Sequence, residues 1–411
     1  MQERIAAEAY YRKRNLNFLT YCLIFVLIWV ESSFYSVNVL PGTAKLILAL
    51  VSIVPLVLFR FANVINIKKF LFAILLLAWI LIFGLISSSN AFKQTFIMFI
   101  HCLVGAVFSI YIDEDEFIEK FNNIVYFLAI YSLIGFIINI FLFSLVEKFP
   151  TIYSMNTGIT YYNLFFTVVC NNTYVVRNYG MFWEPGAFSV FLCIALFFEL
   201  IKSKNLKLTR IIIISITILT TKSTLGIIAV ILLYLIYFIR NPIAFTGKNR
   251  KLLFCVVFAI IILLFFIPHD FYSEIFDKLY KLDNYGNVNS SMQTRLNAVY
   301  YMLNAFFNSA GFGIGIENYL YIQETYCNDI ATATMANWLA IYGILWGGIC
   351  ICGYLRYFLK SFKFSFSAIL ILIFAVLLLA TENFLMNPFI YALIFYGLGE
   401  KQNEKLSLYC N

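Results

Sequence analysis

The arrangement of this chain depends on one stretch, residues 211–239, which reads IIIISITILTTKSTLGIIAVILLYLIYFI. As a single helix it would extend about 44 Å, at about 1.5 Å per residue, far beyond a hydrocarbon layer of about 30 Å. As two short helices that meet at Lys222, it forms a hairpin whose outer ends, at Arg210 and Arg240, lie on one side. Hydroxyl side chains beside Lys222 can satisfy the backbone groups that a break leaves unpaired. We therefore predict a hairpin.

The composition indicates that lipid covers most of the exterior. Of the 411 residues 62% are hydrophobic and 12% are charged, whereas soluble proteins keep about a quarter of their residues charged. Repeated apolar runs approach the length of about 20 residues that a membrane-spanning helix needs. Backbone groups in lipid must satisfy one another, as they do in a helix. The predicted fold class is therefore an all-α polytopic membrane protein.

The apolar runs predict about twelve transmembrane helices in a single membrane domain over residues 1–411. With the hairpin counted as two, the expected spans are 18–36, 44–59, 70–87, 95–112, 122–144, 185–201, 211–239, 252–268, 334–355, 366–380 and 388–398.

Positive charge sets the expected orientation of these spans. With the N and C termini both cytoplasmic, 21 of the 29 Lys and Arg residues lie inside and 8 lie outside, as the positive-inside rule requires. The net charge of +8 thus reflects topology, and no basic patch on a soluble domain indicates nucleic acid as a partner. The eight outer residues are Lys45, Lys93, Lys148, Arg177, Lys222, Lys278, Lys281 and Arg295.

Two long extracytoplasmic loops, about 145–184 and 269–333, stand out between the predicted spans. Long loops usually carry function or are disordered. Disorder is disfavoured because both loops are rich in Tyr, Phe, Trp and Leu and poor in charge. We expect them to pack as amphipathic segments over the outer membrane surface and to contain the functional site.

The first outer loop ends in a polar and aromatic motif at residues 177–188, RNYGMFWEPGAF. Pro185 suits the first turn of a helix, so this helix directs free N–H donors and a partial positive charge outward. Arg177 precedes it, and guanidinium and helix end together can receive one anion. Glu184 is either the ion-pair partner of Arg177 or a proton acceptor, and both alternatives stay open.

The second outer loop contains Arg295, which begins an apolar-periodic segment, 296–307, expected to be a re-entrant or interfacial helix. A glycine run at 311–315, GFGIG, follows. Because no strand precedes this run, a dinucleotide loop is disfavoured. We predict a tight turn that leads to Glu317 and Asn318.

Three further polar positions are weaker candidates. Lys222 is either a residue that snorkels to the outer interface or part of the site, since an ionisable residue at a helix break is a functional candidate. Glu382 and Asn383, at the outer end of an apolar run, are candidates of the same kind and rank below the arginines. His101, among apolar neighbours, is interpreted as a packing residue.

The outer side thus offers two arginines, a lysine, a helix N-terminus and a glutamate. No CxxC pair and no Cys/His cluster occurs, so neither a metal nor another cofactor is predicted. Arginine grips phosphate through two parallel hydrogen bonds, and two arginines neutralise a diphosphate without a metal. A lipid-linked diphosphate fits such a site, and it is a good leaving group once its charge is stabilised.

In this order, the motifs resemble those of the Wzy-type O-antigen and capsular polysaccharide polymerases, which are relatives of the O-antigen ligases. By topology the resemblance covers most of the chain, and its motifs are short. They are 177–186 (RNYGMFWEPG), 223–226 (STLG), Arg295 with 311–315 (GFGIG), and 337–345 (NWLAIYGIL).

The resemblance implies a metal-independent glycosyltransferase in the bacterial cytoplasmic (inner) membrane. In this family the growing chain leaves its undecaprenyl diphosphate and joins the next lipid-linked repeat unit. The implied partners are the undecaprenyl-diphosphate-linked glycan, membrane lipid and a chain-length regulator protein. The product class, whether O-antigen of lipopolysaccharide, capsule or another exopolysaccharide, stays open.

The resemblance also implies roles for individual residues. By analogy Arg177 and Arg295 act in catalysis by holding the diphosphates of donor and acceptor, and Lys222 assists in diphosphate binding. A general base must lie within reach of the acceptor hydroxyl, and Glu184 is the expected base. The expected sugar-stacking residues are Tyr179 and Trp183.

Three other readings compete with a polymerase. The ligases carry a histidine near the position where this chain has residues 335–337, MAN, and its absence favours polymerase over ligase. A lipid-linked oligosaccharide flippase or other transporter is usually built from two related halves, and no duplication is visible here. A structural subunit without chemistry does not explain arginines in apolar outer loops, because a buried charge needs a partner.

Overall fold

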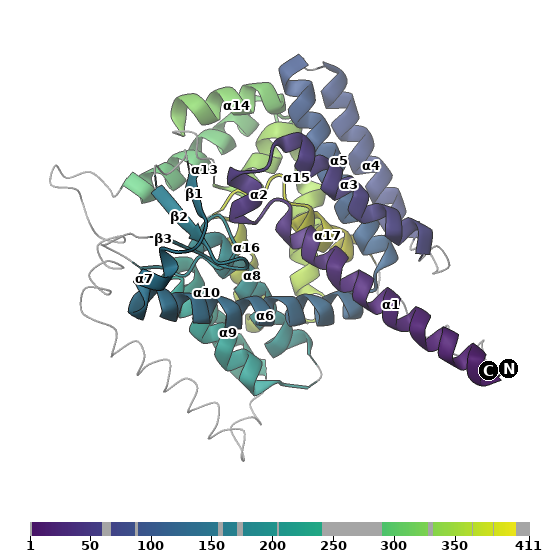
Figure 1. Cartoon of the computed structure of the whole chain (residues 1–411). Helices are drawn as coiled ribbons and strands as arrows, with labels where there is room; N and C mark the ends of the chain where they lie inside the picture. The colour runs from purple at the N-terminus through teal and green to yellow at the C-terminus, as the bar shows by residue number, and fades with distance from the viewer. Residues whose placement is uncertain are drawn as a thin grey trace.

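The computed structural model describes residues 2–59, 67–86, 89–154, 159–170, 176–203, 205–240, 290–327, 332–363, 365–380 and 382–399. Helices make up most of this part of the chain (Figure 1). The predicted span 252–268 lies outside the described residues.

Five of the described helices are long and apolar enough to cross a membrane. They are α4 (Ile67–Ile86), α5 (Ser89–Tyr111), α6 (Glu114–Phe141), α8 (Pro185–Phe197) with its π-helical continuation η1 (Phe198–Lys202), and α15 (Thr334–Leu359).

Helices whose apolar segments are shorter, at 10–17 residues, lie at the other predicted spans that the structure describes. The chain is therefore a mostly helical protein of the multi-pass membrane class, as its composition predicts. These helices are α1 (Gln2–Trp29), α3 (Gly42–Phe59), α9 (Leu208–Thr220), α10 (Thr224–Arg240), α16 (Phe366–Ala380) and α17 (Pro388–Leu398).

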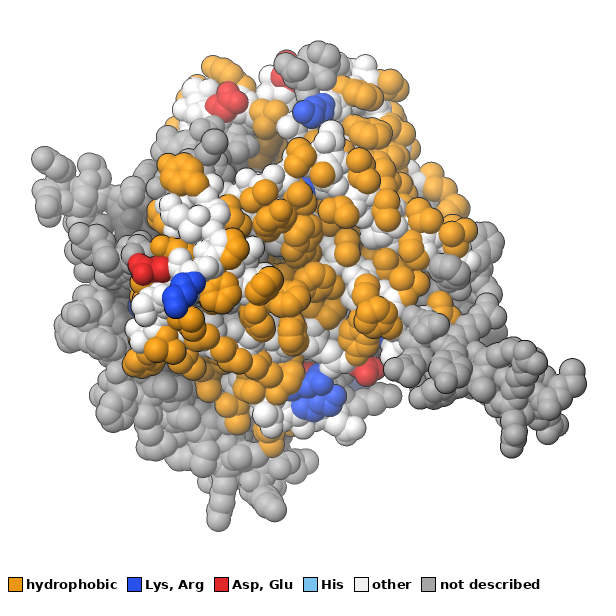
Figure 2. Space-filling model, in the orientation of Figure 1, with side chains coloured by type: hydrophobic (Ala, Val, Ile, Leu, Met, Phe, Trp, Pro, Cys, Tyr) orange, Lys and Arg blue, Asp and Glu red, His pale blue; other side chains and the backbone are white. Residues whose placement is uncertain are grey.

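The outward-facing side chains of the bundle are apolar. On α3, for example, Ile47, Val51 and Leu58 are each more than half exposed, at 60%, 57% and 68%. Among the described side chains that Figure 2 colours by type, hydrophobic ones predominate and charged ones are few. Such a continuous apolar surface is incompatible with water and is typical of contact with lipid.

The stretch 211–239 folds as the predicted hairpin. Helix α9 ends at Thr220, α10 begins at Thr224, and Lys222 between them has a positive φ of 52°. The hydroxyls of Ser215 and Tyr234 lie 2.9 Å apart, although a continuous helix would separate these residues by about 28 Å. The chain therefore reverses at Lys222.

Two helices form the centre of the bundle. Almost every residue of α8 and every residue of α17 is buried. Aromatic rings join the two helices, with Phe191 and Phe389 centroids 4.9 Å apart. On the other side of α17, Gly397 lies directly against Gly353 of α15, and small residues of this kind let helix backbones approach closely. This packing fixes the positions of the N-termini of α8 and α17, which can therefore hold the side chains of a site in place.

The segment predicted as the first outer loop contains a small β-sheet, a structure that the sequence analysis did not predict. Its antiparallel strands, in the order β1-β2-β3, are Thr151–Ser154, Ile159–Asn163 and Val168–Cys170. It follows the short helix α7 (Phe143–Val146) and packs Tyr161 against Phe34 of another short helix, α2 (Phe34–Asn38), at 4.4 Å between rings. The expectation of amphipathic pieces over the membrane surface does not describe this loop.

The segment predicted as the second outer loop contains α13 (Ser290–Asn308) and α14 (Gly315–Tyr326), so the helix expected at 296–307 is present. The glycine run between them forms the predicted tight turn, with positive φ at Gly311, Gly313 and Gly315. This turn enters a break in α15 at Gly343, where φ is 75°. It replaces the helical bonds lost there, because Ile344 N–H donates to the Gly311 carbonyl at 2.8 Å and Ile314 N–H donates to the Ala340 carbonyl at 2.7 Å.

Charged residues gather at one end of the bundle, here called the paired pole. They are Lys69, Glu114, Lys202, Lys360 and the nearby Glu199–Arg210 pair. Glu114 forms ion pairs with Lys202 and with Lys360, the latter at 3.6 Å. Lys69 donates to the Ser109 carbonyl at 2.5 Å, and Arg210 lies 3.3 Å from Glu199. Each of these basic residues belongs to the side predicted to be cytoplasmic.

Candidate functional site

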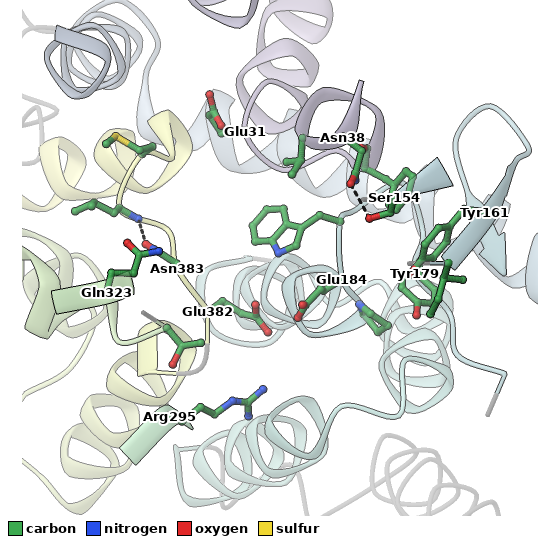
Figure 3. A pocket seen from close by; sticks show the side chains of 18 of the residues that line it. Glu31, Asn38, Ser154, Tyr161, Tyr179, Glu184, Arg295, Gln323, Glu382 and Asn383 are labelled. Carbon is green, nitrogen blue, oxygen red and sulfur yellow. Dashed lines mark hydrogen bonds between the residues drawn. The ribbon is translucent and has the colours of Figure 1, made fainter. Parts of the chain in front are cut away.

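A cavity of about 830 Å³ lies at the end of the bundle opposite the paired pole, beside the N-termini of α8 and α17 (Figure 3). Segments far apart in the sequence meet around it: the α1–α2 region, the sheet, the segment before α8, α13, α14 and the α16–α17 loop. Its charged lining residues are Glu31, Arg177, Glu184, Arg295 and Glu382.

Arg177 is held by the tip of the α9–α10 hairpin. Its guanidinium donates from Nε to the Thr221 carbonyl at 3.1 Å and from Nη2 to the Lys222 carbonyl at 3.4 Å. The neighbouring Asn178 is buried and donates from Nδ2 to Thr220 Oγ1 at 3.0 Å. The broken hairpin therefore sets the position of Arg177, which explains why the motif at 177–186 and the break at Lys222 belong to one site.

Glu184 stands where the sequence predicts it, at the N-cap of α8 with Pro185 as the first helical residue. Its side chain is open to the cavity but makes no capping hydrogen bond to the helix. Trp183 N–H donates to the Ser32 carbonyl at 3.2 Å, which ties this segment to the α1–α2 connection. The carboxylate is thus presented to the cavity on a rigid support.

Glu382 faces Glu184 from the loop between α16 and α17 (Figure 3). It is buried, with 4% of its surface exposed. A Cβ at position 186 would overlap Oε1 of Glu382, so Gly186 provides the space that this carboxyl occupies. Thr334 fixes the loop, because its hydroxyl donates to the Glu382 carbonyl at 2.7 Å and accepts from Phe384 N–H at 2.9 Å.

Arg295 reaches the same cavity from the first turns of α13. Within the described part of the chain, neither Arg295 nor Arg177 forms an ion pair with Glu184 or Glu382. The reading of Arg177 and Glu184 as a structural ion pair is therefore not what the structure shows. Both guanidiniums line the cavity without being neutralised by direct contact with a carboxylate.

The two carboxyl groups share one electrostatic environment. Burial raises the pKa of Glu184 above its usual 4.5, and Arg177 and Arg295 offset part of that rise. Burial raises the pKa of Glu382 well above 4.5, the charge of Glu184 raises it further, and the two arginines oppose the shift. Such environments separate the proton affinities of two acids and are typical of acid–base sites.

Neutral polar and aromatic side chains form the rest of the wall. On one side Ser154 donates to Asn38 at 2.9 Å, next to Tyr161 and Tyr179, whose ring centroids are 5.4 Å apart. Burial raises the pKa of Tyr179, so its hydroxyl stays protonated. Amides and hydroxyls both donate and accept hydrogen bonds, as sugar hydroxyls do. Aromatic rings can stack on the C–H faces of sugar rings. Further neutral polar lining residues are Gln94, Gln323, Thr332 and Asn383.

Glu31 adds a third carboxylate to the cavity wall. It pairs with Lys45 at 3.1 Å, and Oε1 lies 3.5 Å from Nε2 of the buried His101. Burial raises the pKa of Glu31, and Lys45 counteracts that rise. His101 is fully buried and forms no hydrogen bond among the described residues, so its interpretation as a packing residue is kept. The ion pair with Lys45 balances the negative charge of Glu31, whereas Glu382 has no such ion pair among the described residues.

Five of the six residues singled out for the site line this one cavity: Arg177, Tyr179, Trp183, Glu184 and Arg295. The sixth, Lys222, is not among the lining residues. Lys222 contributes its backbone carbonyl to Arg177, and a direct role for its ammonium group stays a prediction.

The sequence analysis named Glu382 and Asn383 as weaker candidates and did not name Glu31, Asn38 and Gln323, and all five residues line the cavity. A usable signal was present for the glutamates, since Glu382 follows the apolar run 366–380 and Glu31 is a charged residue within the span predicted at 18–36. Within the described residues, no group of three or more His, Cys, Asp or Glu side chains is arranged to hold a metal ion. Comparison of the chain with protein families, with curated proteins and with solved structures finds no match.

Proposed function

We propose that this chain is a polysaccharide polymerase of the bacterial cytoplasmic membrane. It joins undecaprenyl-diphosphate-linked oligosaccharide repeat units at the outer face by metal-independent glycosyl transfer. The observation that carries the proposal is the convergence of Arg177, Arg295, Glu184 and Glu382 on one cavity at the end of a lipid-facing bundle.

The two arginines supply the charge that a lipid-linked diphosphate requires. A guanidinium without a carboxylate in contact keeps its positive charge and its remaining N–H donors for a ligand, and arginine matches phosphate oxygens in a bidentate manner. Arg177 is held by two backbone carbonyls, so its orientation is set before the ligand arrives. Preorganised donors of this kind stabilise charge that develops in a transition state.

The proposed reaction needs one base and one stabilised leaving group. Glu184 takes the proton from a hydroxyl of the acceptor sugar as its oxygen bonds to the anomeric carbon of the donor chain. The bond from that carbon to the diphosphate breaks at the same time, and its electron pair stays on the diphosphate oxygen, next to the arginines. Glu184 afterwards releases its proton to water, which completes the balance.

The neutral wall supports a glycan as the substrate. Asn38, Ser154, Gln323 and Asn383 offer both donors and acceptors, and Trp183, Tyr161 and Tyr179 offer aromatic surface. The cavity of about 830 Å³ falls within the range of small-molecule sites, about 300–1,000 Å³, which accommodates a few sugar rings near the reacting bond.

The products that accumulate in cells test the proposal. With Arg177→Ala or Arg295→Ala as the sole copy, we expect long chains to be lost and single repeat units to remain on the carrier lipid. Removing one such group typically lowers a rate about 10²–10³-fold. Arg240→Ala is the matched control, because that guanidinium packs over the Phe362 ring at 4.6 Å, away from the cavity.

The same experiment separates the alternatives. A ligase-like transferase would leave long chains on the carrier lipid, whereas a flippase would leave single units on the cytoplasmic face. Normal long chains in both arginine variants, at normal protein level, would contradict the assignment.

A further inference from the structure

We infer that Glu184 and Glu382 act as an unequal pair, in which Glu382 holds a proton and thereby positions Glu184 as the proton acceptor. This inference rests on the proposed function for its catalytic part. Its structural part, the protonated state of Glu382, concerns the folded chain alone and can be tested without any substrate.

The first argument is the burial of Glu382 without a cationic contact. With 4% of its surface exposed, an ionised Glu382 would need a bonded cation, because isolated buried charges are strongly unfavourable. Within the described residues no Lys, Arg or His forms an ion pair with it, whereas the partly buried Glu31 and Glu114 both have such partners. A carboxyl group in this position is stable in its neutral form.

The second argument is the charge balance of the cavity. The titratable and charged groups that act on Glu382 are Glu184 at the start of α8, Arg177 before it and Arg295 on α13. With both glutamates ionised, two positive and two negative charges would cancel, and a diphosphate would gain little attraction. With one proton on the pair, the set keeps a net positive charge for the ligand.

The third argument decides which glutamate holds the proton. Glu184 is open to the cavity, where an acceptor hydroxyl and water can reach it, whereas Glu382 is enclosed beside Gly186 and Thr334. The carboxyl groups face one another in Figure 3, so a neutral Glu382 can direct its O–H toward Glu184. That hydrogen bond orients the base and lets it stay ionised. Glu382 is therefore a positioning residue, because it acts through Glu184.

The catalytic test compares Glu382→Gln with Glu382→Leu in membranes of the host strain, which contain the native lipid-linked repeat units. Gln keeps a neutral donor of similar size, so we expect a rate within about threefold of the natural chain. Leu removes the donor, and a loss of about tenfold or more is expected, because the base loses a charge-assisted hydrogen bond.

The pH profile provides a readout that a merely structural role would not change. The natural chain is expected to lose activity on the acid side, where Glu184 is protonated, and on the alkaline side, where Glu382 ionises. Glu382→Gln should keep the acid limb and lose the alkaline limb. An inactive Glu382→Gln protein of normal stability, or one that keeps the alkaline limb, would overturn the positioning role.

The substrate-free test follows thermal unfolding of the purified chain in detergent against pH. A glutamate whose pKa is raised in the folded state stabilises the fold fully below its unfolded value of 4.5, and this contribution is lost as pH rises through the folded pKa. We expect Glu382→Gln to reduce that loss. An unchanged pH dependence in this variant would overturn the protonated state, whereas normal long chains in the arginine variants would contradict the polymerase proposal and leave the protonated state standing.

Discussion

The two ends of the bundle use charge in opposite ways. At the paired pole Glu114 lies in contact with Lys202 and Lys360, and Glu199 with Arg210, so opposite charges meet directly. At the cavity Arg177 and Arg295 line the same space as Glu184 and Glu382 without forming ion pairs among the described residues. Charges that contact one another serve stability, whereas charges kept apart around a cavity are available to a ligand. This contrast supports a site at the second end.

The largest effect that tests this contrast is expected for Glu184→Gln. Gln keeps the shape of the side chain but cannot accept the proton, and general bases contribute about 10²–10⁴-fold to rates. Chain extension should fall by that factor while thermal unfolding changes little. The measurement is chain extension in membranes from cells with the variant as the sole copy. A variant that keeps its rate would show that the base lies elsewhere.

The next effect concerns the contact between the glycine run and α15, which supports Arg295. In Gly343→Ala the new Cβ would overlap the Phe312 carbonyl oxygen, and φ at this position is 75°. We expect the free energy of unfolding to fall by about 3 kcal/mol, since strain and overpacking add. Gly348→Ala in the same helix is the control, because its nearest neighbour is a side-chain carbon at 3.6 Å. Equal melting temperatures for the two variants would contradict this account.

A smaller effect is expected at the paired pole. Glu114→Gln leaves Lys202 and Lys360 without their common anion, and we expect a loss of about 1–3 kcal/mol in stability. The rate of chain extension per folded molecule should stay unchanged, which is the reverse of the result for Glu184→Gln. Melting curves in detergent, combined with activity normalised to folded protein, check it. A Glu114→Gln variant with normal stability but slower chain extension would contradict the assignment of this end to stability alone.

The smallest effect is expected for Lys222→Ala. Arg177 contacts the Lys222 carbonyl, which the substitution keeps, and a solvent-screened charge contributes about 0.2–1 kcal/mol. Chain extension should therefore fall by no more than about fivefold. A loss equal to that of Arg177→Ala, at normal protein level, would mean that the ammonium group itself holds the diphosphate.

The features that the sequence predicted well depend on local patterns. Apolar runs located the described helices at the predicted spans, and Pro185 located the start of α8, because each signal lies within one segment. The polar cluster at Lys222 marked the hairpin for the same reason. The outer-loop motifs also brought Arg177, Glu184 and Arg295 to attention, since charges and aromatics in apolar loops are uncommon.

The features that were missed depend on contacts between distant segments. Glu382 occupies the space left by Gly186, 196 positions earlier in the chain, and no local pattern reports such a pairing. The sheet at 151–170 consists of strands of three to five residues, too short to give a clear alternation. Gly343 looks like an ordinary helical glycine until the turn at 311–315 is seen to enter the break.

The insertion of the 311–315 turn into α15 also limits how the protein can be recombined. Hydrogen bonds between the two backbones hold the Arg295-bearing segment to the break at Gly343, and the close approach leaves no room for a Cβ at Gly313 or Gly343. A chimera that exchanges residues 290–327 alone would combine a foreign 311–315 turn with the native break in α15, although the two segments fit each other. Grafts between related chains should therefore carry residues 290–327 together with α15, because these two segments form the smallest exchangeable module on that side of the cavity.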